Sequence, residues 1–176
     1  MNKELRSRWF AHALVISCLA ASCAPAPEAG PAETAEPAEA ARDLGAQARA
    51  GIEEGNRRFM EALSGGDAAG VAAQYTTDAR LLPPNAEAVE GPEAIREFWA
   101  GVIGSGVTGV DLETVEVDAS DGWAWEVGRL EIRGADDQVV ERGSYAVRWE
   151  LQDGTWKLDR DIWNSRLTPG GEPSPQ

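Results

Sequence analysis

Two aspartates near the end of the sequence, Asp159 and Asp161, have a spacing that could support proton transfer. They lie in a segment, 156–163, whose alternation predicts a β-strand, so their Cα atoms would stand roughly 7 Å apart on one face with Trp163. If that face lined an apolar cavity, repulsion and desolvation would raise the pKa of at least one carboxyl group. Asp161 or Asp159 could then act as a base, and both are candidate catalytic residues together with Tyr145.

Arg129 is predicted to face the same space. In the expected strand 123–133, alternation puts Trp125 and Arg129 on one face, which we assign to the interior. Arg129 could then pair with Asp161 or Asp159. A buried charge needs a partner whatever the protein does, so such a pair fits a structural role as well as ligand binding or catalysis.

Aromatic side chains supply most of the other candidate contacts. Tyr145 could donate a hydrogen bond as an electrophilic group, and Trp125 and Trp163 are placed near the mouth of a pocket. Trp99, Trp149 and Trp156 fit a core or a subunit interface better than a ligand platform. The candidate ligand-binding residues are Phe59, Tyr75, Trp125, Arg129, Tyr145, Asp159, Asp161 and Trp163.

The elements that must position these residues change from helical to strand periodicity along the chain. Apolar spacing and capping residues predict helices over 41–63, 68–75 and 92–104. Alternation with a period of two predicts strands over 78–82, 110–117, 123–133, 139–151 and 156–163. Helices followed by a meander of strands predict an α+β domain with helices on one face of an antiparallel sheet.

The first 22 residues predict a secretory signal peptide. Basic residues precede an apolar stretch that is shorter than the roughly 20 residues of a membrane-spanning helix. The stretch ends in Leu19-Ala20-Ala21-Ser22-Cys23, which resembles the lipobox of bacterial lipoproteins. That resemblance implies cleavage before Cys23 and acylation of its thiol. Cys18 is a rival site, and an ordinary secretory signal with an incidental cysteine is the alternative.

Composition divides the rest of the chain into a domain and two flanking segments. An Ala-, Pro- and Glu-rich segment has too little apolar surface to offset the entropy of ordering, and the C-terminal tail shares this property. We therefore expect a signal peptide over 1–22, the lipidated cysteine and a disordered tether over 23–42, one α+β domain over 43–167, and a disordered tail over 168–176.

Charge and missing residue types exclude several functions. The sequence has 16 Lys and Arg against 30 Asp and Glu, a net charge of −14 at pH 7, which disfavours nucleic acid as a partner. The single histidine, His12, lies in the signal peptide, and no cysteine follows Cys23. The mature domain therefore has no Ser-His-Asp triad, cysteine nucleophile, disulfide or His- or Cys-ligated zinc site. We expect no metal and no cofactor.

Several motifs resemble the nuclear-transport-factor-2-like superfamily, in its SnoaL-like and ketosteroid-isomerase-like branch. They are RRFMEALSGGD at 57–67, YTTDA at 75–79, EGPEAIREFW at 90–99 and WKLDRDIW at 156–163. The resemblance covers about residues 45–165. It implies a curved antiparallel sheet wrapped around N-terminal helices, a cystatin-like α+β cone with an apolar pocket that often dimerises through the sheet.

The same resemblance argues against steroid isomerisation. The phenolic oxyanion donor of the isomerases falls at Phe59, their carboxylate base at Pro83 and their protonated acid near Tyr145. Phe59 has no proton to donate and Pro83 offers no base, so the isomerase mechanism is not expected.

Three functions remain open. The first is a membrane-tethered module that binds a small, partly hydrophobic molecule. The second is an isomerase-, cyclase- or dehydratase-type enzyme that uses Asp161 or Asp159 as base and Tyr145 or Arg129 as electrophile. The third is a ligand-free dimerisation domain whose cone is filled by side chains.

The expected location is the cell envelope, in contact with the membrane through the lipid anchor only. Ala24, which follows the acylated cysteine, fits the outer membrane facing the periplasm if the cell is Gram-negative. A homodimer is expected through the outer face of the sheet, with Trp156, Leu158 and Ile162 near the contact.

Overall fold

The computed structural model describes residues 35–166, with side chains from residue 39 onward. The signal peptide, Cys18, Cys23 and the tail after 167 lie outside the described residues. The helices are α1 (Ala35–Ser64), α2 (Ala68–Ala72), α3 (Pro92–Gly104) and the 3₁₀ turn η1 (Ala135–Asp137). The strands are β1 (Tyr75–Leu82), β2 (Val89–Glu90), β3 (Gly109–Ser120), β4 (Trp123–Arg133), β5 (Val139–Gln152) and β6 (Thr155–Trp163).

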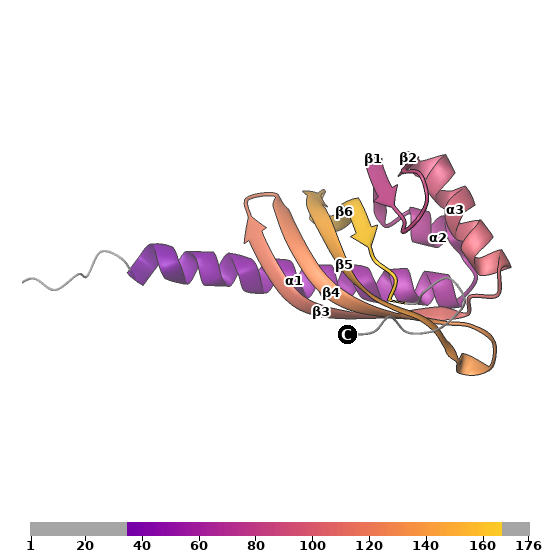
Figure 1. Cartoon of the computed structure of the whole chain (residues 1–176). Coiled ribbons are helices and arrows are strands. Elements are labelled where there is room, and N and C mark those ends of the chain that lie inside the picture. The colour runs from indigo at the N-terminus through magenta and orange to yellow at the C-terminus, as the bar shows by residue number, and fades with distance from the viewer. Residues whose placement is uncertain (1–34, 167–176) are drawn as a thin grey trace, which may run out of the picture. The chain divides into compact units, whose positions relative to one another are not determined.

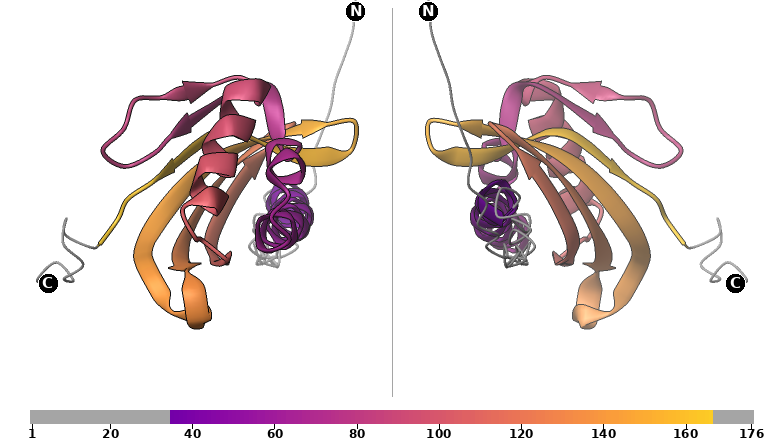
Figure 2. Two further views of the ribbon diagram at one scale, coloured as in Figure 1. Left: turned by 90° about the vertical axis from the view of Figure 1, so that its right-hand side faces the viewer. Right: turned by 90° about the vertical axis from the view of Figure 1, so that its left-hand side faces the viewer.

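The strands form one curved, open sheet in the order β2-β1-β6-β5-β4-β3. Helices α1 and α3 lie on its concave side (Figures 1 and 2). The meander β3 to β6 is antiparallel, as expected, but β6 also pairs in parallel with β1. The α+β class and the cone-like arrangement expected from the resemblance are therefore confirmed.

Helix α1 packs two tryptophan rings against its backbone. Its buried side includes Ala48, Ile52, Phe59 and Leu63. A Cβ atom on Gly55 would stand 2.9 Å from the ring of Trp149, and one on Gly51 would collide with Trp156. Glycine costs helix stability, but here it lets the sheet approach closely. Trp149 and Trp156 are core residues, and Trp99 is also buried.

Some element boundaries differ from the sequence expectation. Helix α1 begins at Ala35, so the last residues assigned to the tether are helical. Helix α2 ends at Ala72, earlier than expected, while Asp67 caps its N-terminus as predicted, its side chain accepting a hydrogen bond from the Gly70 N–H at 2.9 Å. Strand β1 then begins at Tyr75, which was expected to be helical.

A β-bulge interrupts β6 and changes which side chains face inward. The pairing of β5 with β6 shifts so that Trp149 lies opposite Leu158 while Arg148 lies opposite Arg160, which leaves Asp159 as the extra residue. Before the bulge Leu158 is buried, and after it Asp161 is buried while Ile162 is exposed. The inward set therefore switches from even to odd positions within one strand.

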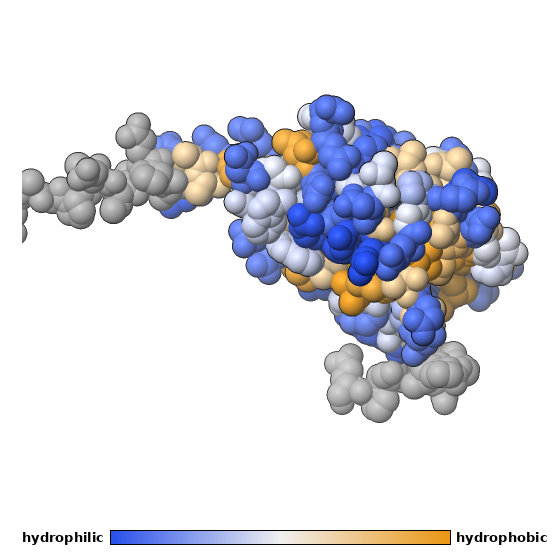
Figure 3. Space-filling view, turned by 90° about the horizontal axis from the view of Figure 1, so that it is seen from above, coloured by the Kyte–Doolittle hydropathy of each residue, from blue (hydrophilic) through white to orange (hydrophobic). Residues whose placement is uncertain are grey.

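One face of the described domain is mostly polar. Seen from above, hydrophilic side chains cover most of the coloured surface and the hydrophobic ones form smaller separate patches (Figure 3). Within residues 35–166, no helix is long and apolar enough to cross a membrane.

Candidate functional site: an apolar cavity with buried carboxyl groups

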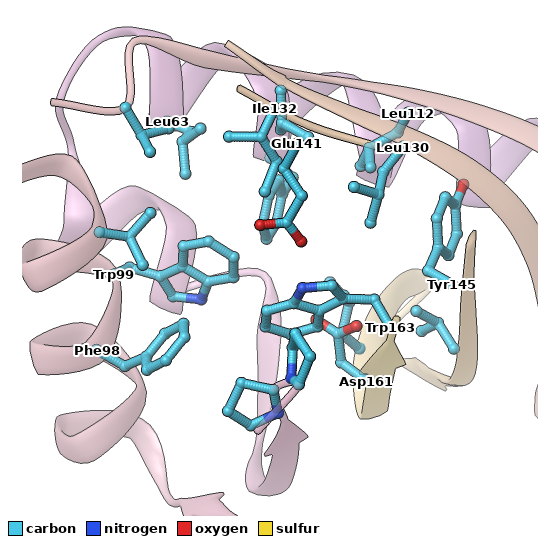
Figure 4. A pocket seen from close by; sticks show the side chains of 18 of the residues that line it. Leu63, Phe98, Trp99, Leu112, Leu130, Ile132, Glu141, Tyr145, Asp161 and Trp163 are labelled. Carbon is cyan, nitrogen blue, oxygen red and sulfur yellow. The ribbon is translucent and has the colours of Figure 1, made fainter. Parts of the chain in front are cut away.

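A cavity of about 330 Å³ lies between the concave face of the sheet and helices α1 and α3. Drug-sized ligand sites begin near this volume, at roughly 300 Å³. Most of the lining side chains are aliphatic or aromatic, and they come from α1, α3 and the four strands β3 to β6 (Figure 4). The exposed lining residues, Ala86, Ser105 and Val140, indicate where the cavity opens to solvent.

Asp161 brings a buried carboxyl group to this cavity. Its Oδ2 atom accepts a hydrogen bond of 2.6 Å from the hydroxyl of Tyr75, which stands behind it on β1. Burial raises the pKa of Asp161 to about 6, the Tyr75 hydrogen bond opposes this shift, and the negative charge of Glu126 adds to it. Asp161 can therefore exchange a proton near neutral pH.

Glu126 is fully buried on β4 behind the cavity wall and is held by four donors. Its Oε1 atom accepts hydrogen bonds from Asn56 at 2.7 Å, Thr114 at 2.6 Å and the Tyr145 hydroxyl at 2.7 Å. Its Oε2 atom accepts one from the indole N–H of Trp149 at 2.9 Å. Because the Tyr145 proton is directed at Glu126, the tyrosine presents its ring, not a hydrogen-bond donor, to the cavity.

Glu141 is a second carboxyl group in the cavity lining. It belongs to β5, and Figure 4 shows its carboxyl group directed into the open space. Its Oε1 atom is buried and has no hydrogen-bond partner among the described residues. Desolvation raises the pKa of Glu141, and a hydrogen bond from Ser165 partly offsets that shift.

Aromatic rings from α3 and β6 form one wall. Trp99 stacks near-parallel with Trp163 at 6.1 Å between ring centroids, and Phe98 meets Trp99 edge-on at 5.3 Å. The Trp99 indole N–H is buried and lacks a hydrogen-bond partner of ordinary geometry. Burial and the charge of Asp161 raise the pKa of the nearby Tyr75 hydroxyl, and the Trp99 N–H partly offsets that rise. An unused donor in an apolar wall is costly unless a ligand or water accepts from it.

Five of the eight predicted site residues come together here. Phe59, Tyr145, Asp161 and Trp163 line the cavity, and Tyr75 contacts it through Asp161. Phe59, Tyr145, Asp161 and Trp163 were each predicted to face inward on the element that carries them, whereas Tyr75 was expected on a helix and lies on β1.

The predicted position of Arg129 is wrong. Arg129 lies on the outer face of β4, where its guanidinium pairs with Glu113 at 3.1 Å, so it cannot pair with Asp161. Trp125, on the same face, is 42 % exposed and is not near the mouth of the cavity. The inward positions of β4 are the even-numbered ones, which include Ala124, Glu126 and Leu130.

Asp159 is buried but does not reach the cavity. At the bulge of β6, its carboxylate accepts hydrogen bonds from Arg148 and from Arg160, the latter at 2.5 Å, and a longer one from Thr76. These contacts satisfy the extra residue of the bulge, so the expected pairing of Asp159 with Asp161 on one pocket face is wrong.

Two carboxyl groups at or behind the cavity wall, those of Glu141 and Glu126, were not predicted from the sequence. Glu141 could have been found by extending the alternation of Tyr145 and Val147 backward along β5. Glu126 was missed because the tryptophans of β4 were taken as inward, and hydrophobicity pointed to the wrong face.

Comparison with known proteins decides the family. The profile of the SnoaL-like domain matches residues 56–158. The chain belongs to the SnoaL-like domain family. A steroid Δ-isomerase of Nocardioides simplex is 33% identical over 121 residues, an alignment that covers 68% of this chain and 92% of the relative.

Solved structures agree with this SnoaL-like fold. A ketosteroid isomerase-like protein of Erwinia carotovora atroseptica superposes with a TM-score of 0.57 at 24% identity, covering 68% of this chain and 96% of that one. An NTF2-like protein of unknown function from Pseudomonas putida gives 0.61 at 18% identity, covering 74% and 95%. These likenesses concern the fold.

The three positions that the resemblance assigned to isomerase chemistry all line the cavity. They carry Phe59, Pro83 and Tyr145 in this SnoaL-like domain. The cavity thus occupies the place expected for such a site, while the side chains at those positions offer neither a base nor a free phenolic donor.

Proposed function

We propose that this protein is a membrane-tethered SnoaL-like binding protein whose cone holds a small, largely apolar molecule with at least one polar group. The observation that carries the proposal is the cavity of about 330 Å³, whose apolar lining contains unused hydrogen-bonding atoms on Trp99 and Glu141. A ligand-free assembly domain would need neither the open volume nor the unpaired polar atoms, because side chains would fill the cone.

Filling the cavity tests the proposal. N-phenyl-1-naphthylamine, a neutral apolar fluorophore, should bind the full chain with an increase in fluorescence. Replacing a wall residue in Val147→Trp should reduce that binding at least tenfold, because the indole would occupy the ligand's volume. The matched variant Val127→Trp, on the exposed outer face of β4, should bind as the wild type does.

Equal binding by both variants would place the fluorophore outside the cone and refute the proposal. Native mass spectrometry of the chain purified from its own host provides a second measurement. A retained small molecule that is lost in Val147→Trp would identify the natural ligand class.

A proton-transfer enzyme is the second candidate function, and the raised pKa of Asp161, about 6, favours it. Asp161 would act as the base, without help from Tyr145, whose proton is directed at Glu126. The expected signature is a pH–rate profile with an inflection near pH 6 that disappears in Asp161→Asn. Ligand binding that survives in this variant without any turnover in the wild type would leave only the binding function.

In this proposal, the protein is attached to the membrane through a lipid on Cys23. We expect Cys23→Ser to release the chain from the membrane fraction or to accumulate as an uncleaved precursor, because each buried CH₂ of a lipid contributes about 0.8 kcal/mol. Fractionation with an antibody against the domain measures this. A fully processed Cys23→Ser protein that stays in the membrane would exclude acylation at this residue.

A further inference from the structure

The half-buried Glu141 and the buried Asp161 differ from Asp159 and Glu126, because they have neither a cationic partner nor a full set of hydrogen-bond donors. Asp159 has two arginine partners and Glu126 has four hydrogen-bond donors. Among the described residues, neither Glu141 nor Asp161 takes part in a salt bridge, and both line the same apolar cavity. A carboxylate in apolar surroundings is costly unless a positive charge joins it.

Among the described residues, no positive side chain lines the cavity and could compensate these two carboxyl groups. Glu141 and Asp161 are the only charged residues among the described side chains that line it. Glu141 lies near the start of β5 and Asp161 lies on β6 opposite Val147, and Figure 4 shows both carboxyl groups bordering the open space. The cavity is therefore electronegative at its polar end.

The aromatic wall provides a second feature suited to a cation. Phe98, Trp99 and Trp163 are in mutual ring contact beside the carboxyl groups. The negative faces of aromatic rings attract ammonium groups, most strongly where water is excluded. Trp99 is 8% exposed, so this aromatic wall is largely shielded from water.

We propose that the ligand of the cone is a small organic cation, a protonated amine attached to an apolar body, with its ammonium group between Glu141 and Asp161. This rests on the proposed binding function and names its ligand class. The apolar body packs against the aliphatic walls, and the ammonium group supplies the charge that the two acids lack. The net charge of −14 assists by attracting cations toward the molecule.

Three probes of similar shape separate charge from hydrophobicity. Phenethylamine is a cation at pH 7.5, 2-phenylethanol is neutral but retains a hydrogen-bond donor, and phenylacetate is an anion. Each is added to the full chain loaded with N-phenyl-1-naphthylamine, and displacement of the fluorophore is measured. Phenethylamine should compete at a concentration about tenfold lower than 2-phenylethanol, and phenylacetate should compete least.

Isosteric variants test whether the carboxylates of Glu141 and Asp161 bind the ammonium group. Glu141→Gln should weaken competition by phenethylamine about tenfold and leave 2-phenylethanol unchanged, and Asp161→Asn should do the same independently. Glu116→Gln, at an exposed position of β3, is the matched control and should behave as the wild type.

The outcomes distinguish this inference from the function on which it rests. If the alcohol or the carboxylate competes as well as the amine, or if both variants leave the amine unaffected, the cation assignment is wrong while the apolar cavity remains a binding site. If the fluorophore itself does not bind, the proposed function fails as well.

Discussion

Asp161 and Glu126 show how differently one protein can treat two buried carboxyl groups. Glu126 accepts four hydrogen bonds, so it fixes the position of Asn56, Thr114, Tyr145 and Trp149. Asp161 accepts a hydrogen bond from Tyr75 and borders the cavity. A hydrogen-bond network in which every group has a partner is rigid. A carboxyl group with few partners can still bind a ligand or exchange a proton. We therefore propose a structural role for Glu126 and a functional role for Asp161.

The raised pKa of Asp161 predicts that Asp161→Asn stabilises the domain near neutral pH. The carboxyl pKa is about 6 in the folded protein against an ordinary 3.8. Between these values the unfolded chain loses its proton first, so stability falls as pH rises through this window and is lowest above pH 6. The shift corresponds to about 3 kcal/mol, which asparagine would recover in part while still accepting from Tyr75.

Urea unfolding at pH 4.5 and pH 7.5 measures this effect. Asp161→Asn should gain stability at pH 7.5 and show a smaller difference between the two pH values than the wild type. Asp118→Asn, at an exposed position of β3, serves as control and should change neither. A marked loss of stability at pH 7.5 would contradict the prediction and would instead suit a carboxylate with a cationic partner, such as the pair with Arg129 that the structure lacks.

At the scale of elements, the sequence predicts the strands well and their inward faces less well. Alternation predicts β4 at residues 123–133, as observed. An alternating strand has two faces, however, and the face that carries the tryptophans was assigned to the interior. Trp123 and Trp125 turned out to be exposed, and the buried positions carry Ala124 and Glu126. Side-chain size and hydrophobicity cannot identify the inward face when the outer face is itself apolar.

The site depends on a bulge that alternation alone cannot reveal. A regular β6 would place Leu158 and Asp161 on opposite faces, yet both line the cavity. The extra residue, Asp159, reverses the phase and is stabilised by Arg148 and Arg160, which come from the pairing of β5 with β6. The prediction that Asp161 and Trp163 face inward is correct, because odd-numbered residues face inward after the bulge. The prediction that Leu158 faces outward is wrong, because Leu158 precedes the bulge, where even-numbered residues face inward.

The packing of β4 against β5 predicts a strong effect of a single methyl group. Gly128 lies opposite Tyr145, and a Cβ atom there would overlap the tyrosine ring. Gly128→Ala should therefore displace Tyr145 from Glu126 and destabilise the domain by about 1–3 kcal/mol in urea unfolding. Gly109→Ala, at a strand position with open space, should change stability by no more than about 0.5 kcal/mol. Equal effects of the two substitutions would show that Tyr145 is not packed as described.

At the scale of the whole molecule, the outer face of the sheet still fits a homodimer, with different contact residues from those expected. Trp156 and Leu158 are buried in the core and cannot contribute. The register places Val127, Ala146 and Ile162 in one row across three strands, beside the exposed Trp125. Such an apolar strip is costly to leave in water.

Light scattering should therefore report a dimer at tens of micromolar. Trp125→Glu should convert it to a monomer, because two negative charges would meet across a symmetric contact. Leu44→Glu, an exposed residue on α1, is the control and should leave the dimer intact. A wild-type monomer at this concentration would rule out the interface.

The sheet order also determines when this protein can fold. Among the described strands, β6 is the last to be synthesised, yet it occupies an interior place between β1 and β5, and it supplies Leu158, Asp161 and Trp163 to the cavity. Until the ribosome has released it, β1 and β5 both present unpaired edges, which can pair with other chains. Folding of the domain must therefore follow translation of its final strand, and a nascent chain stopped before Thr155 would have neither a closed sheet nor a binding site.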